Sequence, residues 1–378
     1  MKFIVSMDSF KGSLNQKELG VIIENKIKSL LPDSTVINFP MADGGEGTLD
    51  CFIESLDAEI VNVEIHDPLM RKCKTYYAIK GNTAIIEMAK ASGLTLLKNE
   101  ERSIKFTTTY GVGEMIKDAL DRGILDFIIT IGGSATNDGG IGMLSALGVK
   151  FYDSNNSLLQ PIGESLEKIN KIDIEHFDER LSRATFKIAC DVDNPLSGPN
   201  GATFIYGPQK GGTMNDILMI DQGLINYSKV ANKLMNADFS NHSGAGAAGG
   251  LGYAYKTFFN SKLIPGIDIM LERINFKSHL KNTDYIITGE GKIDHQSAMG
   301  KVISGIAKIG KNNHIPVIAI GGIIDYNGHE LYDLGITKMF SILPQGMSLE
   351  NAMEKENTIK NLEMTIEKII RLINKKEW

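Results

Sequence analysis

Cysteine, histidine and tryptophan are scarce in this chain of 378 residues, and no long apolar run occurs. The cysteines Cys51, Cys73 and Cys190 lie far apart and form no Cys-x-x-Cys pair, so neither a disulfide framework nor a cysteine zinc site is expected. No segment approaches the roughly 18 apolar residues of a membrane span. The apolar run within residues 1–8 is too short for a signal peptide. A cytoplasmic location is therefore expected.

Motifs of three common enzyme classes are missing or incomplete. The Walker A pattern Gly-x-x-x-x-Gly-Lys-Ser/Thr does not occur, which argues against a P-loop NTPase. Residues 244–249 match Gly-x-Gly-x-x-Gly, but a helical pattern precedes them where the dinucleotide fingerprint needs a strand. An NAD-dependent hydroxy-acid dehydrogenase is therefore a disfavoured alternative. Ser134 lacks the final glycine of the Gly-x-Ser-x-Gly elbow, so a serine hydrolase is a minor alternative.

The chain carries a modest negative charge, with a formal net charge of −6. Because its lysines are scattered, a general binder of nucleic acid or of anionic membranes is disfavoured, and a small-molecule partner is expected. The length is sufficient for two domains. The sequence leaves the oligomeric state open, with a homo-oligomer as one alternative.

Buried strands alternate with amphipathic helices at both ends of the chain, which predicts an α/β fold. The first strand covers residues 3–7, and residues 13–16 fit a capping box at the start of the next helix. A second strand covers residues 35–39. The alternation returns late in the chain, with strands at 285–288, 317–320 and 338–342 and a last helix at 357–374.

The middle of the chain has a different pattern. Three short strands separated by turns predict a meander, at residues 60–65, 74–79 and 83–88. Further strands at 127–131 and 186–189 and helical stretches around 213–236 and 246–259 follow. We therefore predict a second, mixed α/β domain of residues 66–281, inserted into a first domain that consists of residues 1–65 plus 282–378.

Six glycine-dense clusters recur along the chain, and all but the fifth contain acidic, lysine or hydroxyl residues. They cover residues 8–13, 42–48, 132–140, 191–210, 244–250 and 288–292. Glycine lets the backbone approach a ligand closely and leaves N–H groups able to point at an anion. Several clusters follow predicted strands, where open α/β sheets bind ligands. Phosphate chemistry with a metal ion is the leading hypothesis.

Phosphoryl transfer needs cations over the transferred group, a carboxylate-bound Mg²⁺ and a carboxylate that accepts a proton. The acidic candidates in the clusters are Asp8, Asp43, Glu46, Asp191, Asp193, Glu290 and Asp294. The cationic candidates are Lys11, Arg71, Lys210 and Lys292. Taken singly, a loop aspartate is usually a turn former and a loop lysine is usually solvated. Their joint placement in glycine loops favours the functional interpretation.

Two candidates have an equally simple structural explanation. Asp138 lies at the start of a predicted helix, so it either caps that helix or faces a cation beside the 132–140 loop. Gly246 precedes a predicted helix that begins near Ala247. This segment is either a junction of small residues or an anion site at the helix N-terminus.

Taken together, the clusters resemble those of the bacterial type I glycerate kinases. The resemblance spans essentially the whole chain and rests on Asp8-Ser-Phe-Lys-Gly-Ser, Pro40-Met-Ala-Asp-Gly-Gly-Glu-Gly-Thr, Ile131-Gly-Gly-Ser-Ala-Thr-Asn-Asp-Gly-Gly, Ala189-Cys-Asp-Val-Asp-Asn-Pro-Leu-Ser-Gly-Pro, Gly207-Pro-Gln-Lys-Gly and Ile287-Thr-Gly-Glu-Gly-Lys-Ile-Asp. It implies ATP-dependent phosphorylation of D-glycerate with Mg²⁺, in this branch typically giving 2-phosphoglycerate. It also implies that the discontinuous domain is flavodoxin-like (Rossmann-like) and that the active site lies in the cleft between the domains. A non-catalytic regulator that binds a nucleotide or a sugar acid is the alternative from another class.

The hypotheses for individual residues follow from these roles. The catalytic candidates are Lys11 and Lys292, which would neutralise phosphate or carboxylate, Asp43, which would hold Mg²⁺ or orient substrate, and Asp191, which would act as the base. The candidates for binding the nucleotide are Gly132, Gly133, Ser134, Thr136 and Gly246. The candidates for binding the substrate are Asp8, Ser9, Arg71 and Asp294. The metal candidates are Glu46 and Asp138.

The chain departs from the family's common pattern at two turns. Asp67-Pro-Leu-Met-Arg71 stands where a turn of the type Gly-Pro-Leu-Gly-Arg is common, and Ile303 replaces a frequent proline. Both lie outside the acidic clusters, so they bear on local loop geometry more than on activity.

Overall fold

The computed structural model describes residues 1–42, 44–45, 47–325 and 329–375. The chain divides into two compact units, which are named here unit 1 (residues 1–43 and 265–378) and unit 2 (residues 44–264). The sequence-based boundaries lie elsewhere, because they assign residues 44–65 to the first domain and 265–281 to the second. Within the described residues, no helix has both the length and the apolar character needed to cross a membrane.

Unit 1 is built on a parallel sheet of five strands in the order β2-β1-β11-β12-β13. The strands are β1 (Lys2–Met7), β2 (Thr35–Asn38), β11 (Tyr285–Ile293), β12 (Val317–Ile324) and β13 (Ile336–Ser341). If the strands are counted along the chain within this unit, the order is 2-1-3-4-5, which is the flavodoxin-like arrangement. The predicted α/β fold class with a parallel, discontinuous domain is confirmed.

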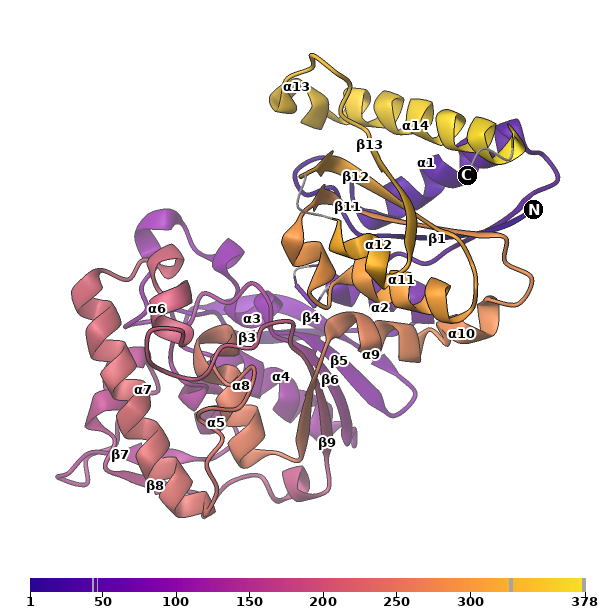
Figure 1. The fold of residues 1–378 in the computed structure, drawn as a ribbon. Helices are drawn as coiled ribbons and strands as arrows, with labels where there is room; N and C mark the ends of the chain where they lie inside the picture. The colour runs from indigo at the N-terminus through magenta and orange to yellow at the C-terminus, as the bar shows by residue number, and fades with distance from the viewer. Residues whose placement is uncertain (43, 46, 326–328, 376–378) are drawn as a thin grey trace. The chain divides into compact units, whose positions relative to one another are not determined.

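Helices cover this sheet because their apolar residues recur at helical spacing. Helix α1 (Gln16–Leu30) and the long C-terminal helix α14 (Lys355–Lys375) lie side by side and share a core with β1, β11 and β12 (Figure 1). The remaining elements of unit 1 are α9 (Gly266–Arg273), α10 (Phe276–His279), η6 (His295–Ala298), α11 (Val302–Asn312), α12 (Glu330–Leu334) and α13 (Leu349–Met353).

The predicted capping box at the start of α1 is wrong by two residues. The helix is capped by Asn15, whose side chain accepts from the N–H of Glu18 at 2.9 Å, while the Glu18 carboxylate accepts from the N–H of Asn15 at 3.0 Å. Both Ser13 and Asn15 are favourable N-cap residues, so the choice depends on which one has an acidic residue three positions later. The Ser13 hydroxyl instead contacts that of Thr358.

Unit 2 contains a mixed sheet of six strands in the order β10-β9-β6-β5-β4-β3. The strands are β3 (Glu59–His66), β4 (Lys72–Lys80), β5 (Thr83–Glu87), β6 (Asp126–Thr130), β9 (Thr185–Ala189) and β10 (Ser261–Ile264). The predicted meander is confirmed, since β3, β4 and β5 pair antiparallel. Strands β5, β6, β9 and β10 pair parallel, so their carboxyl ends lie at one edge.

The other elements of unit 2 surround this sheet. They are α2 (Thr48–Leu56), α3 (Ala89–Ser92), η1 (Leu94–Leu96), η2 (Asn99–Glu101), α4 (Tyr110–Asp121), α5 (Ile141–Ala146), a small antiparallel pair β7 (Lys150–Tyr152) and β8 (Lys171–Asp173), η3 (Gly163–Lys168), η4 (Glu179–Ser182), α6 (Ala202–Tyr206), η5 (Pro208–Lys210), α7 (Met214–Met235) and α8 (Ala247–Phe258). The start of α8 is not regular helix, because Ala248, Gly249 and Gly250 have positive φ.

Candidate active site

The sheet of unit 1 has a topological switch point between β1 and β11. From β1 the chain crosses to β2 on one side, and later builds β11, β12 and β13 on the other side. Ligands of open α/β sheets bind outside the carboxyl ends of the strands at such a point. Asp8 follows β1 directly, and its N–H donates to the carbonyl of Gly289 in β11 at 2.8 Å. The fold therefore brings the first and the last glycine cluster together.

A pocket of about 350 Å³, named here the switch-point pocket, opens at these strand ends. Its polar lining includes Asp8, Ser9, Lys11, Glu290, Lys292, Asp294 and Lys301, and its apolar lining includes Phe10, Ile323, Ile342 and Leu349. Six residues singled out in the sequence thus line one cavity, namely Asp8, Ser9, Lys11, Glu290, Lys292 and Asp294, although they come from two segments about 280 positions apart. Lys301 was not among the predicted residues, but it follows Gly300 in a Gly-Lys pair that resembles Gly291-Lys292.

The lining sets three lysines, Lys11, Lys292 and Lys301, beside the carboxyl groups of Asp8, Glu290 and Asp294, so its formal charges balance. Lys292 lies 3.3 Å from a carboxylate oxygen of Asp294 and 3.8 Å from one of Asp325, and its side chain is 58% exposed. The ammonium groups of Lys11 and Lys301 make no ion pair with any residue that the structure describes. Exposed ion pairs are weak, so an incoming anion can displace the partners of Lys292 at little cost. The pocket can therefore hold a phosphate or carboxylate group.

In unit 2, three glycine clusters meet at the carboxyl ends of the parallel strands. The N–H of Gly132, which follows β6, donates to the carbonyl of Gly44 at 3.2 Å. A Cβ at Gly132 would lie 2.7 Å from the Cα of Gly45, and a Cβ at Gly44 would lie 3.4 Å from a carboxylate oxygen of Asp191. Glycine is therefore required at Gly132 because two backbones touch there. Asp191, the candidate base, follows β9 and lies at the edge of this contact.

Glu87, which was not among the residues predicted from the sequence, anchors the start of α2. This buried carboxylate ends β5 and accepts from the N–H groups of Gly47 at 3.2 Å and Leu49 at 3.0 Å. Burial raises the pKa of the Glu87 carboxyl, and the hydrogen bonds from Leu49 and Gly47 oppose this rise. Glu87 thus supplies the acceptor for the first turn of α2. Asp43 and Glu46, the neighbouring candidates, lie outside the described residues.

The 132–140 loop reaches the surface at Gly133. Gly133 is exposed with φ of 76°, and Ser134 is 6% exposed. Within the described part of the chain, no acceptor lies within hydrogen-bond distance of the N–H groups of Gly133 and Ser134. Thr136, the other candidate in this loop, is fully buried. The geometry therefore suits an anion at Gly133 and Ser134 and disfavours direct contact between a ligand and the Thr136 side chain.

Asp138 accepts hydrogen bonds at the start of α5, which is the structural alternative to the predicted metal binding. It is fully buried, and its carboxylate accepts from the N–H and hydroxyl of Thr109, both at 2.8 Å, and from the N–H groups of Gly140 and Gly142, both at 3.1 Å. Burial raises the pKa of Asp138, and these donors oppose the rise. Because four donors already occupy its oxygens, the geometry argues against the predicted metal role.

Gly246 lies in a junction of small residues, which was the structural one of the two alternatives for this segment. Its N–H donates to the carbonyl of Asn194 at 2.9 Å, and a Cβ there would lie 2.2 Å from the carbonyl oxygen of Pro195. Gly249 packs equally closely, since a Cβ would lie 2.1 Å from the carbonyl oxygen of Thr136. No strand precedes Gly244 among the residues that the structure describes between α7 and α8. The 244–250 cluster is thus a tight junction against the 132–140 loop, and the geometry favours neither an anion site nor an NAD-binding turn.

Arg71 pairs with acidic neighbours within unit 2. Its Nε donates to Asp67 at 2.6 Å and its Nη1 donates to Glu101 at 2.7 Å. These two carboxylates raise the pKa of the Arg71 guanidinium further. The Asp67 carboxylate also closes the turn by accepting from the N–H groups of Leu69 and Arg71. Arg71 therefore stabilises its own turn, and nothing in this geometry supports the predicted contact with substrate.

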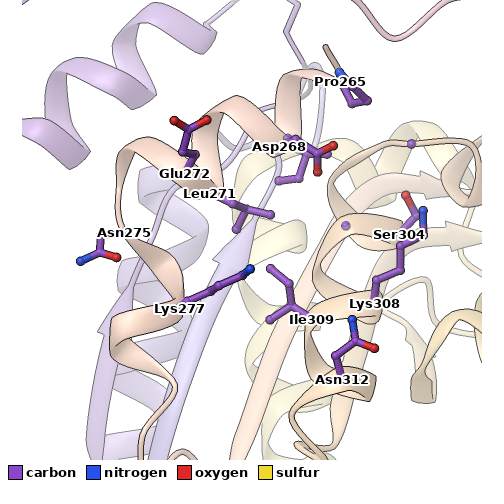
Figure 2. Close-up of a pocket in the computed structure, with 13 residues that line it drawn as sticks. Pro265, Asp268, Leu271, Glu272, Asn275, Lys277, Ser304, Lys308, Ile309 and Asn312 are labelled. Carbon is purple, nitrogen blue, oxygen red and sulfur yellow. The ribbon is translucent and has the colours of Figure 1, made fainter.

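A second pocket of unit 1, of about 470 Å³, lies between α9 and α11. Figure 2 shows Asp268 and Glu272 on α9, and Lys277 reaching toward Ile309 on α11. None of the predicted site residues that the structure describes lines this pocket. The switch-point pocket therefore remains the candidate site of unit 1.

Comparisons with known proteins agree with this geometry. Residues 3–374 match the model of the glycerate kinase family. The chain belongs to the glycerate kinase family. It is 43% identical to a glycerate kinase of Bacillus subtilis over 94% of this chain and 93% of the relative, and 41% identical to the glycerate 2-kinase of Escherichia coli over 93% of each. The crystal structure of a putative glycerate kinase 2 from Salmonella typhimurium superimposes with a TM-score of 0.88 at 38% identity, covering 100% of this chain and 99% of that one. Family membership thus extends over both units.

Proposed function

We propose that this protein transfers the γ-phosphoryl group of ATP to a hydroxyl of D-glycerate and releases 2-phosphoglycerate and ADP. The observation that carries the proposal is the switch-point pocket, in which Lys11, Lys292 and Lys301 face one cavity at the strand ends. Both substrates are anions, and such cations stabilise the charge that shifts during phosphoryl transfer. A relative at 41% identity carries the name glycerate 2-kinase, which supports the 2-phospho product.

The residues then have distinct proposed roles. Lys11 and Lys292 neutralise phosphate or the glycerate carboxylate, and Asp8, Ser9 and Asp294 offer oxygens that hold the substrate hydroxyls. In unit 2 the N–H groups of Gly133 and Ser134 hold phosphate. Asp191 accepts the proton from the glycerate hydroxyl as its oxygen bonds to phosphorus and the bond to ADP breaks. The prediction that the two units share one active site stays a prediction.

Mg²⁺ fits this residue set as a companion of ATP. No group of three or more potential ligand side chains gathers among the described residues. Mg²⁺ usually needs only one or two protein carboxylates, because phosphate oxygens and water complete its shell. Asp8 and Asp294 in the switch-point pocket are carboxylates of this kind. When bound, the ion would neutralise phosphate charge.

The decisive experiment measures ADP release with D-glycerate and with glycerol. D-glycerate should be consumed much faster, because glycerol leaves the cation that faces the carboxylate without a partner. The position of the phosphate is then read from the phosphorus NMR spectrum of the product. Equal rates with both compounds would refute the substrate assignment, and ATP binding without any turnover would favour the regulator.

A further inference from the structure

Unit 2 contains a buried lysine beside the loop proposed to hold phosphate. Lys210 ends η5 and is only 2% exposed. Its Nζ donates to the hydroxyl oxygen of Ser134 at 2.7 Å and to the carbonyl oxygen of Thr136 at 2.8 Å. The ammonium group therefore ties the middle of the 132–140 loop to a different part of the chain.

Burying this cation is costly, and only part of the cost is compensated. Burial lowers the pKa of Lys210 to about 7, and the charge of Asp138 opposes that shift. Asp138 does not pair with Lys210 directly, since its oxygens accept from Thr109, Gly140 and Gly142. Burial raises the pKa of Tyr227 on α7, with smaller contributions from Tyr253 and from the charge of Asp138. A buried charge without a direct ionic partner is a poor source of stability, so a role in positioning accounts for Lys210 better.

The hydrogen bond from Lys210 determines how the Ser134 hydroxyl can bond to a ligand. A hydroxyl has one proton and two lone pairs. Because the ammonium of Lys210 fills a lone pair of Ser134 Oγ, the hydroxyl proton must point elsewhere. The same bond polarises the hydroxyl and makes it a stronger donor.

We propose that Lys210 is a positioning residue, which aims the hydroxyl proton of Ser134 at a phosphate group of the nucleotide bound to the N–H groups of Gly133 and Ser134. The bond to the Thr136 carbonyl fixes the loop in the same orientation. This inference rests on the proposed kinase function for the identity of the anion. The role of Lys210 itself rests only on contacts within unit 2.

The test is a double-mutant cycle with Ser134→Ala, Lys210→Met and both together. Each single change should raise the Kd for ADP and lower kcat/KM for ATP by about tenfold or more, because a hydrogen bond to a charged phosphate is lost or misdirected. KM for glycerate should change little. The double variant should lose no more than the worse single variant, because both act through one hydroxyl. Additive losses would overturn the proposal.

Lys311→Met is the matched control, since its Nζ donates to the carbonyl oxygen of Asp333 and contacts no hydroxyl at the proposed site. It should leave the Kd for ADP and kcat/KM unchanged. Since the Kd for ADP is measured without glycerate, the cycle tests the inference even if glycerate is not the substrate. Normal glycerate phosphorylation with an unchanged Kd for ADP in all variants would overturn the inference and leave the kinase function intact.

A pH profile tests the same contact without relying on the folding of Lys210→Met. In the unmodified protein kcat/KM for ATP should fall as pH rises through about 7, where Lys210 loses its proton. Ser134→Ala should lack that fall, because the alanine has no hydroxyl to direct. An identical alkaline fall in both proteins would refute a role that acts through Ser134.

Discussion

The two units use lysine in opposite ways. In unit 1 the switch-point pocket exposes Lys11 and Lys292 at the ends of the strands, and unit 2 buries Lys210 beneath a glycine loop. An exposed lysine can meet a ligand directly. A buried lysine is costly to charge, so it can act only through the groups that it touches. We therefore propose that the same residue type binds a ligand in one unit and positions a loop in the other.

The carboxylates show the same contrast within unit 2. Asp138 and Glu87 are buried, and each accepts from backbone N–H groups at the start of a helical segment. Asp191 is half-buried beside the glycine contact of Gly44 and Gly132. The buried carboxylates of Asp138 and Glu87 hold the loops, and the half-buried Asp191 remains the candidate for chemistry.

The largest expected effect concerns Asp191. The change Asp191→Asn keeps the shape of the side chain and removes its ability to accept a proton, so we expect kcat to fall by about 10² to 10⁴. The measurement is ADP release with D-glycerate, together with a thermal melt that shows the variant to be folded. The matched control is Asp153→Asn, because Asp153 closes an exposed turn by accepting from Asn155 and Ser157. Full activity of Asp191→Asn would place Asp191 with the loop-forming carboxylates.

A smaller loss is expected for a lysine of the switch-point pocket. Lys11→Ala should lower kcat/KM by on the order of a hundredfold, because a charge that stabilises the transition state is removed. Lys17→Ala, an exposed change on α1, serves as the control and should have normal kinetics. Near-normal kinetics of Lys11→Ala at unchanged stability would show that Lys11 is only a solvated lysine, and the contrast between the two units would then weaken.

The buried lysine should instead affect how stability depends on pH. The pKa of Lys210 in the folded protein is about 7, against an ordinary value of 10.5, so the unfolded chain binds more protons between these values. Stability conferred through this group therefore rises as pH increases across that window, and the full cost of the buried charge is present below it. The free energy of unfolding of the unmodified protein, relative to Lys210→Met, should be higher at about pH 9.5 than at about pH 6.5. Urea melts at both pH values measure it, and a constant difference would contradict the shifted pKa.

The smallest effect is expected at the unusual turn of unit 2. Met70 has φ of 60°, a conformation that costs a side chain about 1–2 kcal/mol, and it stands where the family commonly has glycine. Met70→Gly should raise the free energy of unfolding by no more than about 1 kcal/mol, because glycine's larger entropy in the unfolded chain offsets part of the gain. Leu69→Gly should lower it, since Leu69 is not among the residues with positive φ. Urea melts of both variants decide the sign.

Local patterns in the sequence were sufficient for the fold class and for the elements that carry the site. Apolar strands such as residues 3–7 and 285–288, each followed by a glycine cluster, predict strand ends that bind anions, because alternation and glycine content are properties of short segments. They also marked Asp8 and Lys292 as candidate site residues, and both line the switch-point pocket. Glu87 could not be singled out in this way, because it ends an ordinary apolar strand, and Lys301 had only its Gly-Lys pair as a local signal.

Only the tertiary structure separated the residues that hold loops from those that can meet a ligand. Asp138 and Asp191 look alike in the sequence, as do Lys11 and Lys210, because a glycine loop with an acid or a lysine has the same pattern in either role. The difference is burial, which depends on how distant parts of the chain pack together. Thr109 donates to Asp138 across 29 positions, and Ser134 engages Lys210 across 76 positions. Desolvation then decides whether a charged group is available to a ligand, and no local pattern encodes desolvation.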